Sequence, residues 1–186
     1  MSTGPGDAVR RMTADDLERV LRWRNHPDVR ACMFTRHEIS PEEHARWFAA
    51  AAADPARHLL IFERDGAPLG FASLAVGAAP RVAAWGFYLA PEAPRGSGAA
   101  LGAAVLEHAF GVLGVDEVRG EALAFNTPSI RMHEKLGFHR AGERRQPDEH
   151  GEGEQAVICF QLQRAAWLAG ARPAGPSRHR HGDPTP

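Results

Sequence analysis

A strand-like run followed by a glycine-rich loop and a helical pattern is the feature that most restricts the fold of this chain. The run "RVAAWGFYLA" (81–90) stops at Pro91, and the loop "PRGSGAA" (94–100) leads into "LGAAVLEHAF" (101–110). Glycine and alanine leave the peptide N–H groups uncovered. The first N–H groups of a helix lack partners and carry partial positive charge. The loop therefore predicts an anion cradle where this helix begins.

The spacing of the loop excludes two common nucleotide motifs. Neither GxGxxG nor GxxxxGK[ST] occurs, so neither a dinucleotide fingerprint nor a P-loop is predicted. The 22 basic and 23 acidic side chains nearly cancel. No broad field therefore favours nucleic acid or a membrane, and any anion site must be local. A small-residue turn packed tightly on a sheet is the alternative for the loop.

The rest of the composition indicates one domain in a reducing, cytoplasmic compartment. The 186 residues suit a single core, predicted over 1–170, followed by a disordered tail over 171–186 that is rich in Pro, Gly, His and Arg. Cys32 and Cys159 lie far apart in unlike settings, so neither a disulfide framework nor a metal site is expected. No apolar run reaches membrane-spanning length.

Hydrophobic periods and capping signals predict a mixed α/β (α+β) sheet flanked by helices. The predicted order is a strand, two helices, three strands, a helix, a strand, a helix and two strands. The expected landmarks are a strand at 9–12, helix starts at Thr13 and Ser40, a hairpin turn at Asp65-Gly66, a helix end at about 113, a strand at 118–125, a helix from Thr127 to Gly137, and a last hairpin over 138–163.

The glycine loop and a second segment together resemble the GCN5-related N-acetyltransferases (GNAT). "RGSGAA" fits the R/Q-x-x-G-x-G/A pyrophosphate loop of that family, with Arg95, Gly98 and Ala100 in the motif places. "NTPSIRMHEKLGF" (126–138) is similar to the second signature, in the expected order and separation. The resemblance implies the GNAT fold, a mostly antiparallel sheet of about seven strands that is splayed between strands 4 and 5 and flanked by about four helices.

Earlier segments resemble one subgroup of this family. "LRWRNHPDVRACMFTRHEIS" (21–40), "EEHARWF" (42–48) and "AAWGFYLAPEAPRGSG" (83–98) look like enzymes that acetylate a 4-amino group on a UDP-linked amino-deoxy sugar in pseudaminic acid biosynthesis, a pathway that modifies flagellin. The resemblance implies acetyl-CoA as co-substrate, a UDP-amino-sugar acceptor and no metal. Two alternative functions stay open: an acetyltransferase of the ribosomal-protein type for protein N-termini, and a non-catalytic acyl-CoA-binding module. Assembly as a homodimer is also left open.

The same resemblance implies a site for acetyl-CoA where two parallel strands splay. The backbone from Phe87 to Leu89 would run beside the pantetheine, as an added strand does. Asn126 would contact the pantetheine arm, although an Asn at a helix start is also a common turn residue and Thr127 is expected to fill the cap. Pyrophosphate would bind the N–H groups of Arg95, Gly96, Ser97, Gly98, Ala99 and Ala100.

Three residues are candidates for acyl transfer to an amine. Many family members carry a Tyr in the helix after the Asn as general acid, and His133 stands at that place here. Tyr88 is the only tyrosine, and either side chain could protonate the leaving thiolate or merely pack. Glu121 is the candidate base, because an inward carboxylate in "GEALAF" would be desolvated. An outward, solvated Glu121 or deprotonation through water is the alternative. A strand N–H near Tyr88 or Leu89 is expected to bind the carbonyl oxygen.

Arginine and aromatic side chains gather in the early loop and the second helix. Arginine suits phosphate through its forked donors, and Met or aromatic side chains can lie against uracil. The alternative is that the tryptophans belong to the core and the arginines to the solvated surface. The predicted substrate residues are Arg22, Trp23, Arg24, Met33, Phe34, His37, His44 and Trp47.

Overall fold

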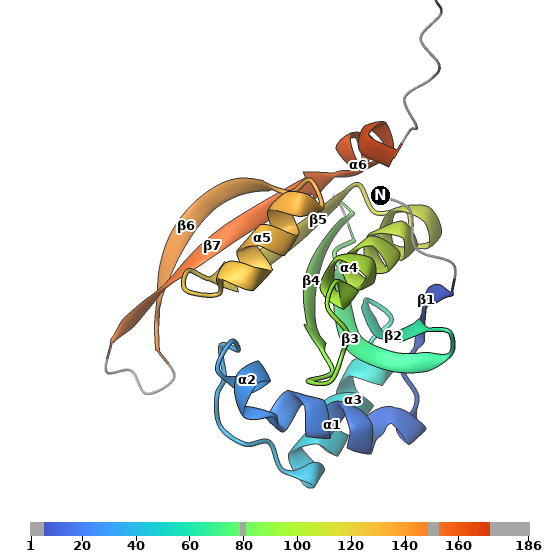
Figure 1. Ribbon diagram of the computed structural model, residues 1–186, viewed down its shortest axis with the longest axis vertical. Coiled ribbons are helices and arrows are strands. Elements are labelled where there is room, and N and C mark those ends of the chain that lie inside the picture. Colours follow the sequence, from blue (N-terminus) through green and yellow to red (C-terminus); the bar gives the residue numbers. More distant parts are fainter. Residues whose placement is uncertain (1–5, 79–80, 149–152, 172–186) are drawn as a thin grey trace, which may run out of the picture.

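A computed structural model describes residues 6–78, 81–148 and 153–171, and it contains one seven-stranded sheet in the order β1-β2-β3-β4-β5-β7-β6 (Figure 1). The strands are β1 (Asp7–Arg11), β2 (Arg57–Arg64), β3 (Ala67–Val76), β4 (Val82–Leu89), β5 (Glu117–Leu123), β6 (His139–Pro147) and β7 (Glu154–Gln163). Only β4 and β5 pair in parallel among the described strands. The predicted mixed, mostly antiparallel sheet is confirmed.

The helices include those predicted to begin after Thr13 and after Ser40. The helices described are α1 (Leu17–Asn25), α2 (Pro27–Arg30), α3 (Pro41–Ala53), α4 (Ser97–Glu107), α5 (Thr127–Lys135) and α6 (Arg164–Ala171), with short helical turns η1 (Ala14–Asp16) and η2 (His108–Val112). The Ser40 hydroxyl accepts the N–H of Glu43 at 3.1 Å, which completes the predicted cap of α3. Asp65 and Gly66 have φ angles of 51° and 77°, as a tight β2–β3 hairpin requires.

The described residues contain six α-helices, two more than the expected four. Pro27 does not simply stop α1, because His26 caps a new four-residue helix, α2. α6 follows β7 directly, and its Trp167 packs on Phe110 with ring centroids 6.2 Å apart. The predicted tail lies outside the described residues from 172 onward, so the domain boundary stays a prediction.

Two hydrophobic cores lie on opposite faces of the sheet. α4 and α5 cover one face through Leu101, Leu106 and Ile130, which pack with Phe62 and Phe160 of the strands. α1 and α3 cover the other face, where the second core includes Val20, Trp23 and Ala51. Figure 1 shows α4 beside β4 and α5 beside β5 and β7, with α1 and α2 below the open end between them. The sheet and its helices therefore form two arms around that end, one containing β1 to β4 and the other β5, β7 and β6.

The two arms separate because β4 and β5 stay paired for only three residue pairs, from Val82↔Glu117 to Ala84↔Arg119. Beyond Ala84, β4 continues along β3 and β5 continues along β7. The Ala90 N–H bonds the Leu69 carbonyl at 2.9 Å, toward β3. Alternation along the strand then turns the backbone N–H and C=O groups of Phe87 and Leu89 toward the opening. The predicted splay between strands 4 and 5 is confirmed.

Candidate active site

Two adjoining cavities occupy the opening between the arms. The larger, of about 560 Å³, lies between the end of β4, the glycine loop and α5, and we name it the loop cavity. The smaller, of about 350 Å³, lies between β4, β5 and the connection from α2 to α3, and we name it the strand cavity. The residues that line both are Cys32, Met33, Phe87, Asn126 and Ser129. A ligand can therefore reach from one cavity into the other.

The glycine loop forms one wall of the loop cavity. Gly96 caps α4 with a φ of 90°, which favours glycine, and Gly96, Gly98 and Ala99 line the cavity. Ser97 donates its N–H to the Pro94 carbonyl at 3.1 Å and Ala100 donates to Gly96 at 3.3 Å. Two of the predicted phosphate donors are thus used within the loop. Gly98 and Ala99, in the first turn of α4, line the cavity, and within the described residues neither amide donates to a carbonyl one turn earlier.

Ser97 of the glycine loop is buried, whereas Arg95 of the same loop is exposed to solvent. The Ser97 side chain is fully buried, and its hydroxyl has no hydrogen-bond partner among the residues that the structure describes. Arg95 is exposed and does not belong to the cavity lining. Its predicted place at the rim is compatible with this position, and no hydrogen bond or ion pair to the part of the chain that the structure describes fixes its guanidinium.

Two cations on α5 that sequence reasoning missed line the loop cavity. Arg131 and Lys135 are one helical turn apart and face it together with Ser129 and Met132. Asp28 is the carboxylate in the same lining. The i,i+4 spacing was a readable signal, but it indicates only that the two side chains share a helix face. Two cations against one carboxylate make this cavity suited to an anion.

Asn126 lies at the junction of the two cavities and caps α5. Its side-chain oxygen accepts the Ser129 N–H at 3.2 Å. The expectation that Thr127 fills the cap is therefore wrong, because Thr127 is the first residue of the helix. Capping uses the carbonyl oxygen of the amide and leaves its NH₂ group as a donor, and Asn126 lines both cavities.

Tyr88 lines the loop cavity from the end of β4. Its ring lies 5.1 Å from that of Phe71, on the sheet face covered by α1 and α3. Burial raises the pKa of the phenol above its usual value of 10.0, against a smaller opposing effect of Arg24. The hydroxyl therefore keeps its proton at neutral pH and can act as a donor.

His133 lies in the core rather than in a cavity lining. Its ring is fully buried, stacked on Phe160 with centroids 4.4 Å apart. Nδ1 lies 2.8 Å from the Ser129 carbonyl and Nε2 accepts the Trp85 indole N–H at 3.1 Å. Burial lowers the pKa of His133 to about 4, despite the backbone hydrogen bond to Ser129. Both nitrogens of the neutral ring are occupied, so His133 packs in the core with no ring nitrogen left for a ligand.

Glu121 lines the strand cavity from β5, where it faces a guanidinium. Arg144 of β6 donates Nε to one carboxylate oxygen at 3.0 Å and Nη2 to the other at 2.7 Å. The Glu121 side chain is 40% exposed. The expectation of a desolvated carboxylate is therefore wrong, because Glu121 is solvated and ion-paired. Sequence reasoning missed Arg144, which comes from a strand beyond β7.

Of the predicted substrate residues, Met33 and Phe34 line the strand cavity. Trp23 and Arg24 are buried under the sheet, and His44 is 4% exposed and stacked on Trp47 at 5.0 Å. The burial of His44 lowers its pKa. Arg22 lines neither of the two cavities but two other surface hollows, one of which shares Pro91 with the loop cavity, and His37 lies 3.1 Å from the Glu43 carboxylate. The expected single cluster does not form, because α1 turns Trp23 and Arg24 inward.

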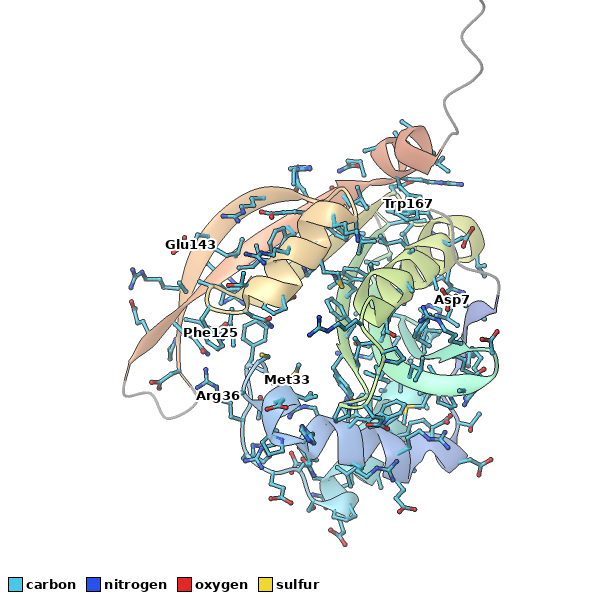
Figure 2. The ribbon with its side chains drawn as sticks, in the orientation of Figure 1. Asp7, Met33, Arg36, Phe125, Glu143 and Trp167 are labelled. Carbon is cyan, nitrogen blue, oxygen red and sulfur yellow. The ribbon has the colours of Figure 1, made fainter. Side chains whose placement is uncertain are left out.

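The connection between α2 and α3, residues 31–40, is anchored by two side chains of α1. Arg24 donates to the Thr35 carbonyl at 2.5 Å. Asn25 exchanges two hydrogen bonds with the backbone of Ile39, at 2.8 and 2.9 Å. Farther out, the Arg36 guanidinium lies 5.6 Å from the Phe125 ring centroid on the opposite arm, and Figure 2 shows Met33 and Arg36 on the side of this connection that faces Phe125. This connection thus forms the third wall of the strand cavity.

Residues 8–139 match the acetyltransferase (GNAT) domain family. The match covers well over half of the chain, which therefore belongs to this family and is an acetyl-CoA-dependent N-acetyltransferase. Within the described residues, no group of three or more His, Cys, Asp or Glu side chains could hold a metal ion. The helices described are also all too short or too polar to cross a membrane.

Two curated relatives carry related descriptions. Acetyltransferase PseH of Campylobacter jejuni is 24% identical over 127 residues, which are 68% of this chain and 79% of that protein. An uncharacterized N-acetyltransferase of the SPbeta prophage of Bacillus subtilis, YokL, is 43% identical over 83 residues, 43% of this chain and 47% of its own.

Two solved structures share the fold. Spermidine N-acetyltransferase of Vibrio cholerae, in complex with CoA and spermine, superposes with a TM-score of 0.79 at 18% identity, over 88% of this chain and 98% of its own. Aminoglycoside acetyltransferase AAC(6')-Ib with coenzyme A gives a TM-score of 0.72 at 21% identity, over the same 88% and 98%. At these identities the likeness supports the fold alone.

Proposed function

We propose that this enzyme transfers acetyl from acetyl-CoA to the amino group of a nucleotide-linked amino sugar, with the 4-amino group of a UDP-linked amino-deoxy sugar as the acceptor. The observation that carries the proposal is the charge of the strand cavity. Its charged lining residues, Arg119 and Glu121, are each held in an ion pair, with Glu117 at 2.5 Å and Arg144 at 2.7 Å. Such a lining offers a polycation no unpaired carboxylate, so an acceptor that is neutral or anionic around its amine fits it better.

The loop cavity has the features that a bound CoA needs. The amides of Gly98 and Ala99 would hold the diphosphate at the positive end of α4. Arg131 and Lys135 would balance its remaining negative charge. A Cβ built on Gly98 would lie 3.6 Å from Met132 Sδ and 3.7 Å from Leu89 Cδ1, so the protein itself leaves that space open. The exposed backbone edge of Phe87 and Leu89 would bond the pantetheine amides.

Acetyl-CoA supplies the acetyl group as a thioester, and three groups of this chain would then act on the transfer. The Leu89 N–H, turned toward the opening, would stabilise negative charge on the carbonyl oxygen. The Tyr88 hydroxyl would donate a proton to the departing sulfur. Glu121 would accept a hydrogen bond or a proton from the acceptor amine, directly or through water, because the oxygen that accepts Arg144 Nη2 has a further lone pair.

A UDP-linked sugar as the acceptor is consistent with the likeness to Acetyltransferase PseH, which extends over 127 residues at 24% identity. The aromatic and sulfur side chains of Phe34 and Met33 in the strand cavity also suit a planar base. Neither the geometry nor the relatives favour a protein N-terminus or a non-catalytic module. The assay below distinguishes both of these functions from acetyl transfer to a sugar.

Thiol release from acetyl-CoA would be measured with a UDP-linked 4-amino sugar and, in parallel, with a panel of peptides. The proposal predicts turnover with the sugar at a kcat/KM at least about tenfold above any peptide, a difference of 1.4 kcal/mol in transition-state binding. Turnover of peptides alone would overturn the acceptor. Absence of turnover with every amine, together with tight CoA binding, would point to a binding module.

A further inference from the structure

The Arg144–Glu121 pair crosses three strands of the sheet to reach the strand cavity. Glu121 lies opposite Cys159 of β7, and Arg144 lies opposite Val157, so the guanidinium spans from β6 over β7 to β5. The contact is bidentate, at 3.0 and 2.7 Å, and Arg144 also donates Nη1 to the Gln146 side chain at 2.7 Å. The hydrogen bonds to Glu121 raise the pKa of Arg144. The guanidinium is therefore a positive charge held beside the Glu121 carboxylate, which itself lines the cavity.

We propose that Arg144 is a specificity-determining residue that closes the acceptor cavity to cationic amines by neutralising Glu121. Glu121 is the carboxylate in the described lining of the strand cavity, with Arg119 as its charged neighbour. An unpaired carboxylate there would attract an aliphatic polyamine. With Arg144 in place, an approaching cation meets the guanidinium together with the carboxylate, and most of that attraction is cancelled.

The same pair leaves a neutral amine free to bind. Each carboxylate oxygen accepts one N–H from Arg144, and one of them also accepts the Cys159 thiol at 4.0 Å. The oxygen that accepts Arg144 Nη2 keeps a further acceptor site. The amine of an uncharged or anionic acceptor can thus still donate to Glu121, whereas a chain of ammonium groups gains no net charge partner. This inference rests on the placement of the acceptor in the strand cavity, which is part of the proposed function.

The test compares Arg144→Ala with the unchanged enzyme on three amines: spermidine, an uncharged amino sugar and a UDP-linked amino sugar. Since Arg144 is 42% exposed on an edge strand, the substitution is expected to leave the fold intact, and thermal unfolding checks this. The kcat/KM for spermidine should rise about fivefold relative to both sugars, as expected for one exposed charge pair. The KM for acetyl-CoA should not change. Where spermidine is not turned over, its dissociation constant from calorimetry gives the same comparison.

Two further variants show whether the rise in kcat/KM for spermidine comes from the Arg144–Glu121 pair. Arg140→Ala removes an arginine of the same strand that pairs with Glu134 at 2.8 Å, away from both cavities, and should leave the spermidine preference unchanged. Adding Glu121→Gln to Arg144→Ala should abolish the gain. The proposal is overturned if the preference stays as in the unchanged enzyme, if Arg140→Ala shifts it equally, or if the double variant keeps the gain. Loss of activity on the UDP-linked sugar alone would count against the proposed acceptor and leave the spermidine comparison intact.

Discussion

At the scale of single residues, Gly98 decides whether a diphosphate can approach the head of α4. A Cβ at this position meets protein atoms at ordinary contact distances of 3.6 and 3.7 Å, so the fold tolerates a side chain. The added branch of Gly98→Val would instead occupy the space in front of the amide. We expect the fold to persist and the affinity for CoA to fall at least about tenfold, or 1.4 kcal/mol, by calorimetry.

The matched control for Gly98→Val is Gly111→Val. Gly111 also lies in a helical turn, η2, and nothing lies within 4 Å of a Cβ built there. This variant should bind CoA like the unchanged protein. Undiminished affinity in Gly98→Val would contradict the assignment of the loop.

His133 makes the stability of the protein depend on pH. Its pKa is about 4 in the folded state against an ordinary 6.5, because burial disfavours the charged ring. The unfolded chain binds the proton more readily, so the free energy of unfolding is highest above pH 6.5 and falls as the pH decreases toward 4. The full loss is on the order of 3 kcal/mol.

Urea unfolding at pH 7 and pH 5 measures this dependence. His133→Gln lacks the titrating ring and should lose less stability between the two pH values than the unchanged protein. His44, His58 and His108, whose pKa values burial also lowers, contribute equally to both proteins and cancel in the comparison. Equal losses in both would mean that His133 is not held neutral in the core.

At the scale of the elements, Gly120 of β5 lets α5 and β4 meet. A Cβ built on Gly120 would lie 2.4 Å from both His133 Nε2 and Trp85 Nε1, which are hydrogen-bonded to each other at 3.1 Å. Gly120→Ala should therefore lower the free energy of unfolding by about 1–3 kcal/mol, through overpacking of this junction. Gly86→Ala on β4, where the nearest atom is Ser73 Oγ at 3.5 Å, is the control and should cost far less.

Asn25 positions the wall of the strand cavity without touching a ligand. Its two hydrogen bonds to Ile39 hold the end of the 31–40 connection. Asn25→Ala should raise the KM for the acceptor about fivefold, as expected when two hydrogen bonds of about 0.5–1.5 kcal/mol each loosen a wall, and leave the KM for acetyl-CoA unchanged. An equal rise in both KM values would indicate a general loss of structure instead.

At the scale of the whole molecule, local signals predicted the fold well and the acceptor side poorly. The cap at Ser40, the turn at Asp65-Gly66 and the small residues before α4 act on their own neighbourhood, so their pattern can be read from the sequence. The burial of Arg24 and the pairing of Glu121 depend on contacts with Thr35 and Arg144, made by other elements. Such contacts leave no local pattern, which is why the predicted cluster of arginines and aromatics divided between core and surface.

The two arms of the sheet are joined by three residue pairs of β4 and β5. We propose that the head of α4, between these arms, binds the diphosphate of CoA, and that the pantetheine lies along the backbone edge of β4, with the acetyl group next to the acceptor amine. A crystal structure of the protein with CoA tests this claim most directly. The account predicts the diphosphate against the amides of Gly98 and Ala99, with the pantetheine along Phe87 and Leu89. Diphosphate bound anywhere else on the protein would contradict it.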